Sequence, residues 1–294
     1  GRSMAITQLY TAVAGDVITA ARWNNEFGNI YNNLVPLLNN YAAPNLKDDF
    51  SAVGDGTTND QSAVASAVAA SYASGQELYW PDGTYLTIAT IPNFHDVKHR
   101  GPGILKRGSD LFYVDPSLQA GQSNNLYIST TGSNTNDGLS SAEPRLTVQS
   151  MGDVIYKYTH GDVTWKINFA AGTYSTTGAT FNRPFPTPNR VQFLGVAVGN
   201  GVQPTVIVQA TTPTTDTFGI YFQNYIRVQV SNINFKNFRK AASPDANELG
   251  IGLVFDTYCE AFTINVWTDD CDQGIYCTNG TMARIQAGRH GFNA

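Results

Sequence analysis

The chain has 294 residues, of which 42% are hydrophobic and 14% charged, and its formal net charge is −5. This composition describes a globular protein with one large domain or two ordinary ones, and it excludes a disordered chain. The 18 lysines and arginines are scattered singly, so the sequence lacks the basic stripe that nucleic-acid binding requires. No apolar run approaches the ~20 residues that cross a bilayer, and we expect no membrane insertion. The many uncharged polar side chains favour a surface suited to sugars.

The first predicted element is a helix within residues 15–40. Trp23, Phe27, Ile30 and Leu34 recur there at nearly helical spacing, which places them on one face. A single apolar face does not stabilise so short a helix in isolation, so this helix needs a partner. The sequence leaves open whether the partner is another subunit or the rest of the chain.

Residues 46–88 predict a strand, a turn, a helix and two further strands. The turn is the Gly-Asp-Gly run at 54–56, and the alanine-rich helix covers residues 60–73. Thr58 or Asn59 is the expected N-cap, because short polar side chains accept hydrogen bonds from the free amides of a first helical turn. Two strands around a Pro-Asp-Gly turn complete this unit.

A second unit with the same order of elements begins at residue 126. A strand leads into a loop rich in Gly, Asn and Asp, a helix follows over residues 147–158, and a strand covers residues 164–170. The Gly-Thr-Tyr run at 172–174 repeats the one at 83–85. Each unit is therefore predicted as strand, loop, helix, strand and Gly-Thr-Tyr turn.

Beyond Arg190 the helical spacing gives way to short β-rich runs between Gly and Asn. Similar runs begin at Gly219, Gly252 and Gly274, first 33 and then 22 residues apart. In this register three columns of side chains stack from run to run. The columns are Ile220, Leu253 and Ile275; Val228, Ala261 and Ala283; and Val230, Thr263 and Ile285. A period of ~20 to 25 residues built from strands alone is typical of a parallel β-helix.

The sequence therefore predicts a mainly β fold, a single-stranded parallel β-helix with an N-terminal helical segment and capping helices. We place the N-terminal segment at residues 1–43, a neck or first β-helix-like unit with a capping helix at 44–120, and the parallel β-helix at 121–294. One end of such a stack needs a cover, and the helices at 60–73 and 147–158 are both candidates. No comparable cap follows at the other end, so we expect a truncated β-helix or a cover from another piece.

Three stretches resemble phage proteins. Residues 49–60, together with residues 78–85, resemble the opening coil of the pectate-lyase-like β-helix superfamily, which recurs in phage tailspikes. Residues 126–174 resemble a second β-helix entry of phage and prophage fibres, and residues 15–27 resemble the virion-proximal segments of tail fibres. The chain is thus similar to the N-terminal portion of a tailspike or tail fibre.

This resemblance implies a right-handed β-helix in a homotrimer located in the virion, as part of the phage tail. It implies two kinds of partner, phage tail or baseplate proteins at one end and a bacterial surface polysaccharide, capsule or lipopolysaccharide, along the β-helix. Hydrolysis, lyase cleavage or binding alone all stay open, as do the host, the sugar and an active site beyond Ala294. If the chain is an enzyme, it is a polysaccharide depolymerase.

One dense acidic cluster supplies candidate catalytic residues. Asp269, Asp270 and Asp272 lie close together, and Glu260 precedes them on the same predicted rung. A glycosidase needs two carboxylates, which makes these four residues candidates. The favoured alternative is that the three aspartates form a turn, since Asp hydrogen-bonds its own backbone and tolerates tight turns.

The predicted register adds candidate substrate-binding residues beside this cluster. It stacks Trp267 under Arg289 and Thr268 under His290. An exposed face there would present an aromatic platform for a sugar ring, with a guanidinium and an imidazole beside it. We therefore name Trp267, Arg289 and His290 as candidate substrate-binding residues.

No cofactor and no metal ion is expected. The histidines lack the spacing of a zinc site, and the loop at 134–138 lacks the alternating Asp pattern of a calcium loop. Cys259, Cys271 and Cys277 are interpreted as small buried hydrophobic residues rather than as disulfides or ligands.

Three functions are compatible with these patterns. The first is a tailspike or tail fibre component that attaches the phage to a surface polysaccharide. The second is a non-catalytic structural adaptor that trimerises and joins the spike to the tail. The third is a bacterial polysaccharide lyase or glycoside hydrolase, which is disfavoured because Met4 is not followed by a secretory leader.

Overall fold

The structure is a computed structural model. It describes residues 43–158, 161, 163–184, 191–199, 201–212, 218–224, 226–239 and 250–290, together with Gly28, and for residues 287–290 it describes the backbone alone. The chain divides into two compact units, residues 1–43 and 44–294. Apart from Gly28, the helix predicted within residues 15–40 lies outside the described residues, and every element named below belongs to the second unit.

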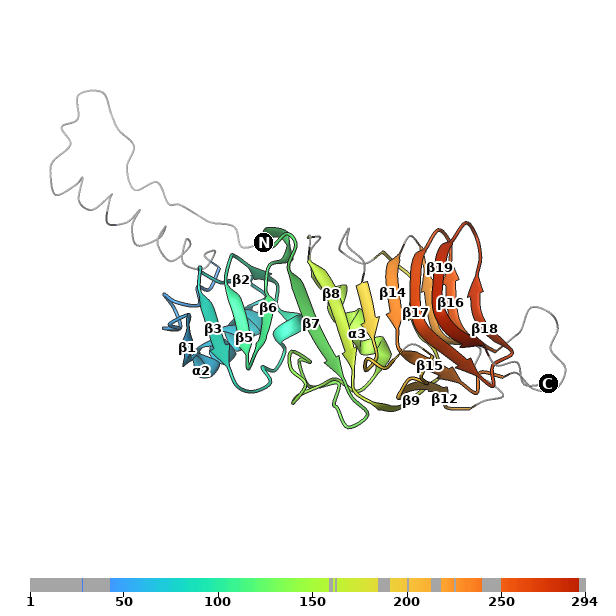
Figure 1. Cartoon of the computed structure of the whole chain (residues 1–294). Coiled ribbons are helices and arrows are strands. Elements are labelled where there is room, and N and C mark those ends of the chain that lie inside the picture. The colour runs from blue at the N-terminus through green and yellow to red at the C-terminus, as the bar shows by residue number, and fades with distance from the viewer. Residues whose placement is uncertain are drawn as a thin grey trace, which may run out of the picture. The chain divides into compact units, whose positions relative to one another are not determined.

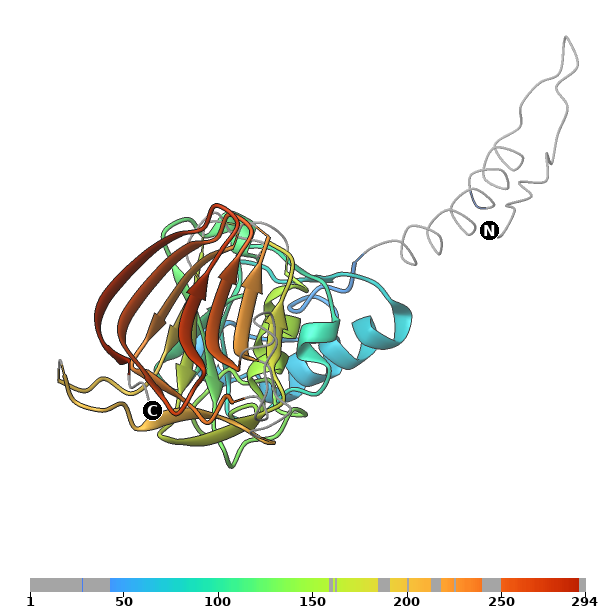
Figure 2. The ribbon, with the colours of Figure 1, turned by 90° about the vertical axis from the view of Figure 1, so that its right-hand side faces the viewer.

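The second unit is mainly β, and 42% of the structure is strand against 13% helix. Strands far apart in sequence stack side by side along it (Figure 1), and they surround one interior (Figure 2). All pairings from β7 onward are parallel. This arrangement is compatible with the predicted β-helix.

The stacked strands form three faces. The first face consists of β7 (Ser123–Ile128), β8 (Thr164–Phe169), β11 (Val191–Leu194), β14 (Arg227–Ser231), β17 (Glu260–Asp269) and β19 (Met282–His290). The second face consists of β9 (Gly172–Thr176), β12 (Val206–Ala210) and β15 (Ile233–Lys236), and the C-terminal part of β17 pairs with β15. The third face consists of β10 (Ala179–Phe181), β13 (Phe218–Gln223), β16 (Ile251–Asp256) and β18 (Gln273–Cys277).

The register predicted from the sequence is confirmed in all three columns. Ile220 pairs with Leu253, and Leu253 pairs with Ile275. The columns that begin at Val228 and Val230 continue through Ala261 and Thr263 to Ala283 and Ile285. A parallel ladder places equivalent residues directly above one another, so a repeated sequence pattern becomes a repeated side-chain column.

The corners of the stack repeat as well. Asn232 and Asn265 both adopt the left-handed conformation, with φ of 54° and 50°, a conformation that Asn tolerates better than most residues. Asn265 Nδ2 donates to Asn232 Oδ1 at 3.1 Å, which links one corner to the next. The following corner repeats the conformation at Asn237 and Asp270, with φ of 61° and 56°. The residues that form the corners therefore repeat in the same register as the strands.

A column of phenylalanines fills the interior beside the third face. Phe181, Phe222 and Phe255 are all fully buried. The first two ring centroids lie 5.1 Å apart with planes at 17°, and the next two lie 5.6 Å apart at 11°. Such stacked rings add to the free energy gained by burying apolar area.

The start of the second unit holds smaller sheets. Its elements are β1 (Asp55–Asn59), α2 (Gln61–Ser74), β2 (Leu78–Tyr79), β3 (Thr84–Thr87), a 3-10 turn at Phe94–Asp96, β4 (His99–Arg100), β5 (Ile104–Arg107), β6 (Asp110–Tyr113) and a second 3-10 turn at Pro116–Leu118. One sheet has the order β1-β3-β5-β6, in which β5 and β6 are antiparallel, and the other pairs β2 with β4. The helix predicted at 60–73 is present as α2.

Asn59 and Asp60, at the start of α2, both accept hydrogen bonds from backbone amides. The predicted N-cap at Thr58 or Asn59 is wrong, because Asp60 occupies the N-cap position and makes no side-chain capping bond. Asn59 Oδ1 nevertheless accepts a hydrogen bond from Gln61 N at 3.0 Å. The buried Asp60 carboxylate instead accepts from Val53 N at 2.7 Å and Gly54 N at 3.0 Å. Asp60 therefore fixes the preceding turn to the helix.

The second helix, α3 (Val148–Ile155), is shorter than the predicted 147–158. It packs on β7 and β10, the first strands of two faces, whereas α2 packs on β2 and β3. At Gly152 a Cβ atom would lie 2.2 Å from the ring of Phe181, so the glycine permits this close approach. Of the two candidate caps, α3 therefore contacts the Phe181 end of the stacked core.

The last described rung differs in exposure from the rungs beneath it. Thr263 is 1% exposed, whereas Ile285, its neighbour in the column, is 51% exposed. Met282 and Tyr276 are 70% and 41% exposed.

No helix in the described part of the chain is long and apolar enough to cross a membrane.

Candidate functional site

The three predicted aspartates lie at the turn between β17 and β18. Asp269 ends β17, and Asp270 and Asp272 follow it. Asp269 Oδ2 accepts hydrogen bonds from Asn234 Nδ2 at 2.9 Å and from Gln203 Nε2 at 3.1 Å. The carboxylate thus ties the strand end to neighbouring segments.

The other two aspartates also hold the backbone in place. Asp270 has a φ of 56° and forms an ion pair with Arg239. The Asp272 carboxylate accepts a hydrogen bond from Gly250 N at 2.8 Å. These contacts are those expected of turn aspartates, and they support the turn interpretation. A catalytic role for the cluster stays a prediction.

Glu260 is not brought to this turn. It begins β17, a strand of ten residues that Asp269 ends. Its carboxylate accepts from Arg227 Nε at 2.8 Å across a partly exposed ion pair. The structure therefore separates Glu260 from the aspartates by the length of the strand.

Trp267 does not form the exposed platform that the sequence suggested. The side chain is only 9% exposed, and its Nε1 donates to Asn265 Oδ1 at 2.9 Å. The predicted backbone register is confirmed, since Trp267 pairs with Arg289 and Thr268 pairs with His290. The side chains of Arg289 and His290 lie outside the described residues.

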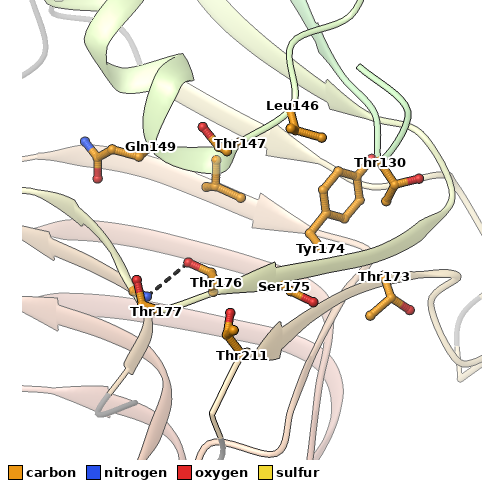
Figure 3. A pocket seen from close by; sticks show the side chains of 12 residues that line it. Thr130, Leu146, Thr147, Gln149, Thr173, Tyr174, Ser175, Thr176, Thr177 and Thr211 are labelled. Carbon is orange, nitrogen blue, oxygen red and sulfur yellow. Dashed lines mark hydrogen bonds between the residues drawn. The ribbon is translucent and has the colours of Figure 1, made fainter. Parts of the chain in front are cut away.

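A groove lined mostly by uncharged polar residues lies elsewhere, along β9 (Figure 3). Its volume is about 500 Å³, within the range of ligand-binding pockets. The lining residues are Thr130, Leu146, Thr147, Val148, Gln149, Thr173, Tyr174, Ser175, Thr176, Thr177, Gly178 and Thr211. None of these twelve residues carries a charge.

Strand alternation explains why β9 presents hydroxyl groups. Successive side chains of a strand point to opposite faces, so Tyr174 is buried while Thr173 and Ser175 on either side of it are exposed. The Tyr174 hydroxyl donates to Ala170 O at 2.8 Å. That contact anchors the strand beneath the groove.

The Gly-Thr-Tyr repeat seen in the sequence corresponds to a repeated structural device. Gly83 and Gly172 have φ of 150° and 147°, which glycine adopts readily. The Tyr85 hydroxyl donates to Pro81 O at 2.9 Å, four residues back, as the Tyr174 hydroxyl does to Ala170 O. The second copy of the device carries the groove.

Five hydroxyl groups of the groove form no hydrogen bond with any described residue. They belong to Thr130, Thr173, Ser175, Thr177 and Thr211. Each hydroxyl offers one donor and two acceptor positions. The groove therefore presents a set of donors and acceptors that only solvent or a ligand can use.

The opposite wall of the groove is fixed by a single asparagine. Asn134 Oδ1 accepts from the backbone amides of Leu146 and Thr147, both at 3.1 Å. Asn134 Nδ2 donates to Thr147 Oγ1 at 3.1 Å. Leu146 is left 40% exposed at the rim and adds an apolar contact surface.

Histidines and cysteines add no metal site among the described residues, which contain no group of three or more His, Cys, Asp and Glu side chains suited to a metal ion. His95 and His99 both pack against Phe94 in one buried cluster. Cys259 is buried as predicted, whereas Cys277 is exposed, and both are free thiols.

Comparisons with known proteins bear on the first part of the second unit. Residues 45–112 match the family model described as rhamnogalacturonase A/epimerase, pectate lyase-like. This match confirms the pectate-lyase-like resemblance of residues 49–60 and 78–85, and it covers less than half of the chain. None of the curated proteins compared with the chain matches it.

Among solved structures, the chain is similar to PfbA, a surface adhesin of Streptococcus pneumoniae, with 17% identity and a TM-score of 0.21. The likeness covers 85% of this chain and 62% of that one, so the chain spans less than two thirds of that structure. The family match at residues 45–112 and the mainly β body of stacked parallel strands are both independent of this likeness.

Proposed function

We propose that the chain is part of a bacteriophage tailspike or tail fibre and binds a bacterial surface polysaccharide in the groove along β9. The observation that carries the binding proposal is the set of five hydroxyl groups that lack a hydrogen-bond partner among the described residues, in a groove of about 500 Å³. A saccharide presents hydroxyl groups that are both donors and acceptors, so it can pair with each of them. Leu146 at the rim suits the apolar face of a sugar ring.

The pectate-lyase-like match supports a polysaccharide as the ligand class. The phage assignment depends on the resemblance of residues 15–27 and 126–174 to tail fibre segments. A right-handed coil, a homotrimer, a place in the virion and docking on tail proteins belong to the same proposal. Fold resemblance supports a scaffold more strongly than it supports chemistry.

For the groove itself we propose binding without cleavage. Glycosidases of the common type use a pair of carboxylates on either side of the scissile bond. None of the twelve lining residues carries one. Hydrolysis by that mechanism would need carboxylates from another place, such as the turn at Asp269.

A binding assay on purified capsular and lipopolysaccharide preparations tests the proposal. The variant Thr173→Val with Ser175→Ala removes two groove hydroxyls and keeps the strand-forming character of β9. If each hydroxyl contributes about 1 kcal/mol, the double variant binds about 30-fold more weakly. The control, Ser62→Ala with Ser66→Ala, removes two hydroxyls from α2 and should bind like the unaltered chain.

Two outcomes would contradict the proposal. If the unaltered chain binds no surface polysaccharide of any tested host, the adaptor function is the better account. If it binds but the groove variant binds equally well, the groove is not the site. A sedimentation measurement that gives a monomer for the full 294-residue chain would remove the trimer.

A further inference from the structure

A second cavity lies beside the groove, between the 3-10 turn at Phe94–Asp96, the loop at 134–137 and the outer side of α3. Its volume is about 370 Å³. Unlike the groove, it is lined by charged side chains of both signs. Arg145 and Lys157 are the cations, and Asp96, Asp137 and Asp153 are the carboxylates.

Arg145 supplies a hydrogen-bond donor that the protein leaves unused. Its Nη1 donates to Asn136 O at 2.7 Å, but its buried Nε has no hydrogen-bond partner among the described residues. Arg145 forms no ion pair with a described carboxylate, and burial lowers the pKa of its guanidinium. A buried donor without a partner is costly in a native protein and calls for a water molecule or a ligand nearby.

Asp153 supplies the complementary acceptor. It is exposed on α3, and its one hydrogen bond within the described residues is a long contact of 3.4 Å from Gln149 Nε2. Two of the other charges are already engaged, since Lys157 pairs with Asp96. Asn93, exposed at the cavity with a φ of 58°, adds an amide that has no partner among the described residues.

The cavity and the groove are neighbours. Gln149 lines the groove and Asp153 lines the cavity, and they lie one helical turn apart on the same face of α3. The two side chains are joined by the 3.4 Å contact. Asn134 of the cavity donates to Thr147 of the groove at 3.1 Å, which makes a second junction. One ridge therefore separates the two hollows.

We propose that this cavity is a second sugar subsite, and that a polysaccharide chain lying in the groove crosses the Gln149–Asp153 ridge and places a further unit there. This inference rests on the proposed function of the groove. Arg145 donates to an oxygen of that unit, while Asp153 and Asn93 accept from its hydroxyl groups. Because its hydrogen bonds involve charged groups, the cavity distinguishes between sugars more sharply than the groove does.

Oligosaccharides of increasing length, cut from the polysaccharide that the chain binds, test the subsite by calorimetry. Asp153→Asn removes the charge and keeps the shape, and Asn93→Gly removes the amide at a position where glycine tolerates positive φ. Each variant should weaken binding of the longest oligosaccharide about tenfold. Neither variant should change the affinity for the shortest fragment that still binds the groove. Asp82→Asn, an exposed aspartate away from both hollows, is the matched control.

The possible outcomes separate this inference from the proposed function. If both variants bind long and short fragments like the unaltered chain, the subsite does not exist, although the groove proposal stands. If the variants weaken short and long fragments equally, the cavity is not a separate subsite. If the unaltered chain binds no fragment of any length, the proposed function itself fails.

Discussion

Asp137 offers a sharp test of how the start of the second unit is joined to the stacked strands. Its side chain is 1% exposed and accepts from Arg107 Nη1 at 2.6 Å, in an ion pair that is almost wholly buried. It also accepts from Ile91 N at 3.0 Å and Leu139 N at 3.1 Å. The substitution Asp137→Asn keeps the shape but replaces one acceptor atom with a donor that faces other donors.

The magnitude follows from these contacts. Removing one partner of a buried ion pair costs about 3–5 kcal/mol, because the remaining charge stays buried without compensation. Glu143 lies 3.4 Å from the same Arg107 nitrogen and compensates in part. We therefore expect a loss of about 3 kcal/mol, at the lower end of that range, and a large fraction of the stability of an ordinary domain.

Urea denaturation followed by circular dichroism measures this loss, provided that the slope of the transition is unchanged. Glu77→Gln is the control, because the exposed pair of Glu77 with Lys98 should contribute at most about 1 kcal/mol. If the free energy of unfolding of Asp137→Asn lies within about 1 kcal/mol of that of the unaltered chain, as expected for the control, the buried ion pair does not hold the start of the second unit to the stacked strands.

Three further predictions concern the core. Burial lowers the pKa values of His95 and His99 to about 4 and about 3. Because both side chains take up protons near pH 6.5 in the unfolded chain but not in the folded one, the contribution of the neutral histidines to stability should be fully present above pH 6.5. The free energy of unfolding should fall by roughly 3 kcal/mol or more between pH 6.5 and 4, which urea midpoints across that range would show. Phe222→Ala should cost about 3–5 kcal/mol in the same assay, because it removes the middle ring of the buried column; a loss below 1 kcal/mol would contradict the packing. Gly195→Ala should lower the melting temperature, because its Cβ would lie 1.9 Å from Asn232 O; an unchanged melting temperature would show that the backbone approach is wrong.

The register of the stack could be read from the sequence because a parallel ladder turns sequence repetition into spatial columns. Aligning the runs that begin at Gly219, Gly252 and Gly274 gave the register. The observed pairings of Ile220 with Leu253 and of Leu253 with Ile275 follow from that alignment. The repeated Gly-Thr-Tyr run likewise predicted a device that the structure builds twice.

The candidate site was harder to predict, because the register fixes which residues are neighbours but not whether their side chains are buried or exposed. Trp267 has the predicted neighbours and is nevertheless buried. The carboxylates of Asp269 and Asp272 accept hydrogen bonds from Asn234, Gln203 and Gly250. No local sequence pattern links these residues to the turn.

The groove was missed for a related reason. Thr173 and Ser175 are unremarkable in sequence, and they line a groove only because β9 meets the segment of Leu146 and Thr147 there. That meeting depends on a hydrogen-bonded asparagine, Asn134, in a loop whose course the sequence does not specify. The threonine-rich run beside Tyr174 was the one signal available.

The most direct test of the central claim is a crystal structure of the chain with an oligosaccharide from the polysaccharide that it binds. The account predicts sugar density in the groove along β9, within hydrogen-bond distance of the Thr173 and Ser175 hydroxyls. Density confined to the Asp269 turn or to another face, with the groove holding only water, would contradict it.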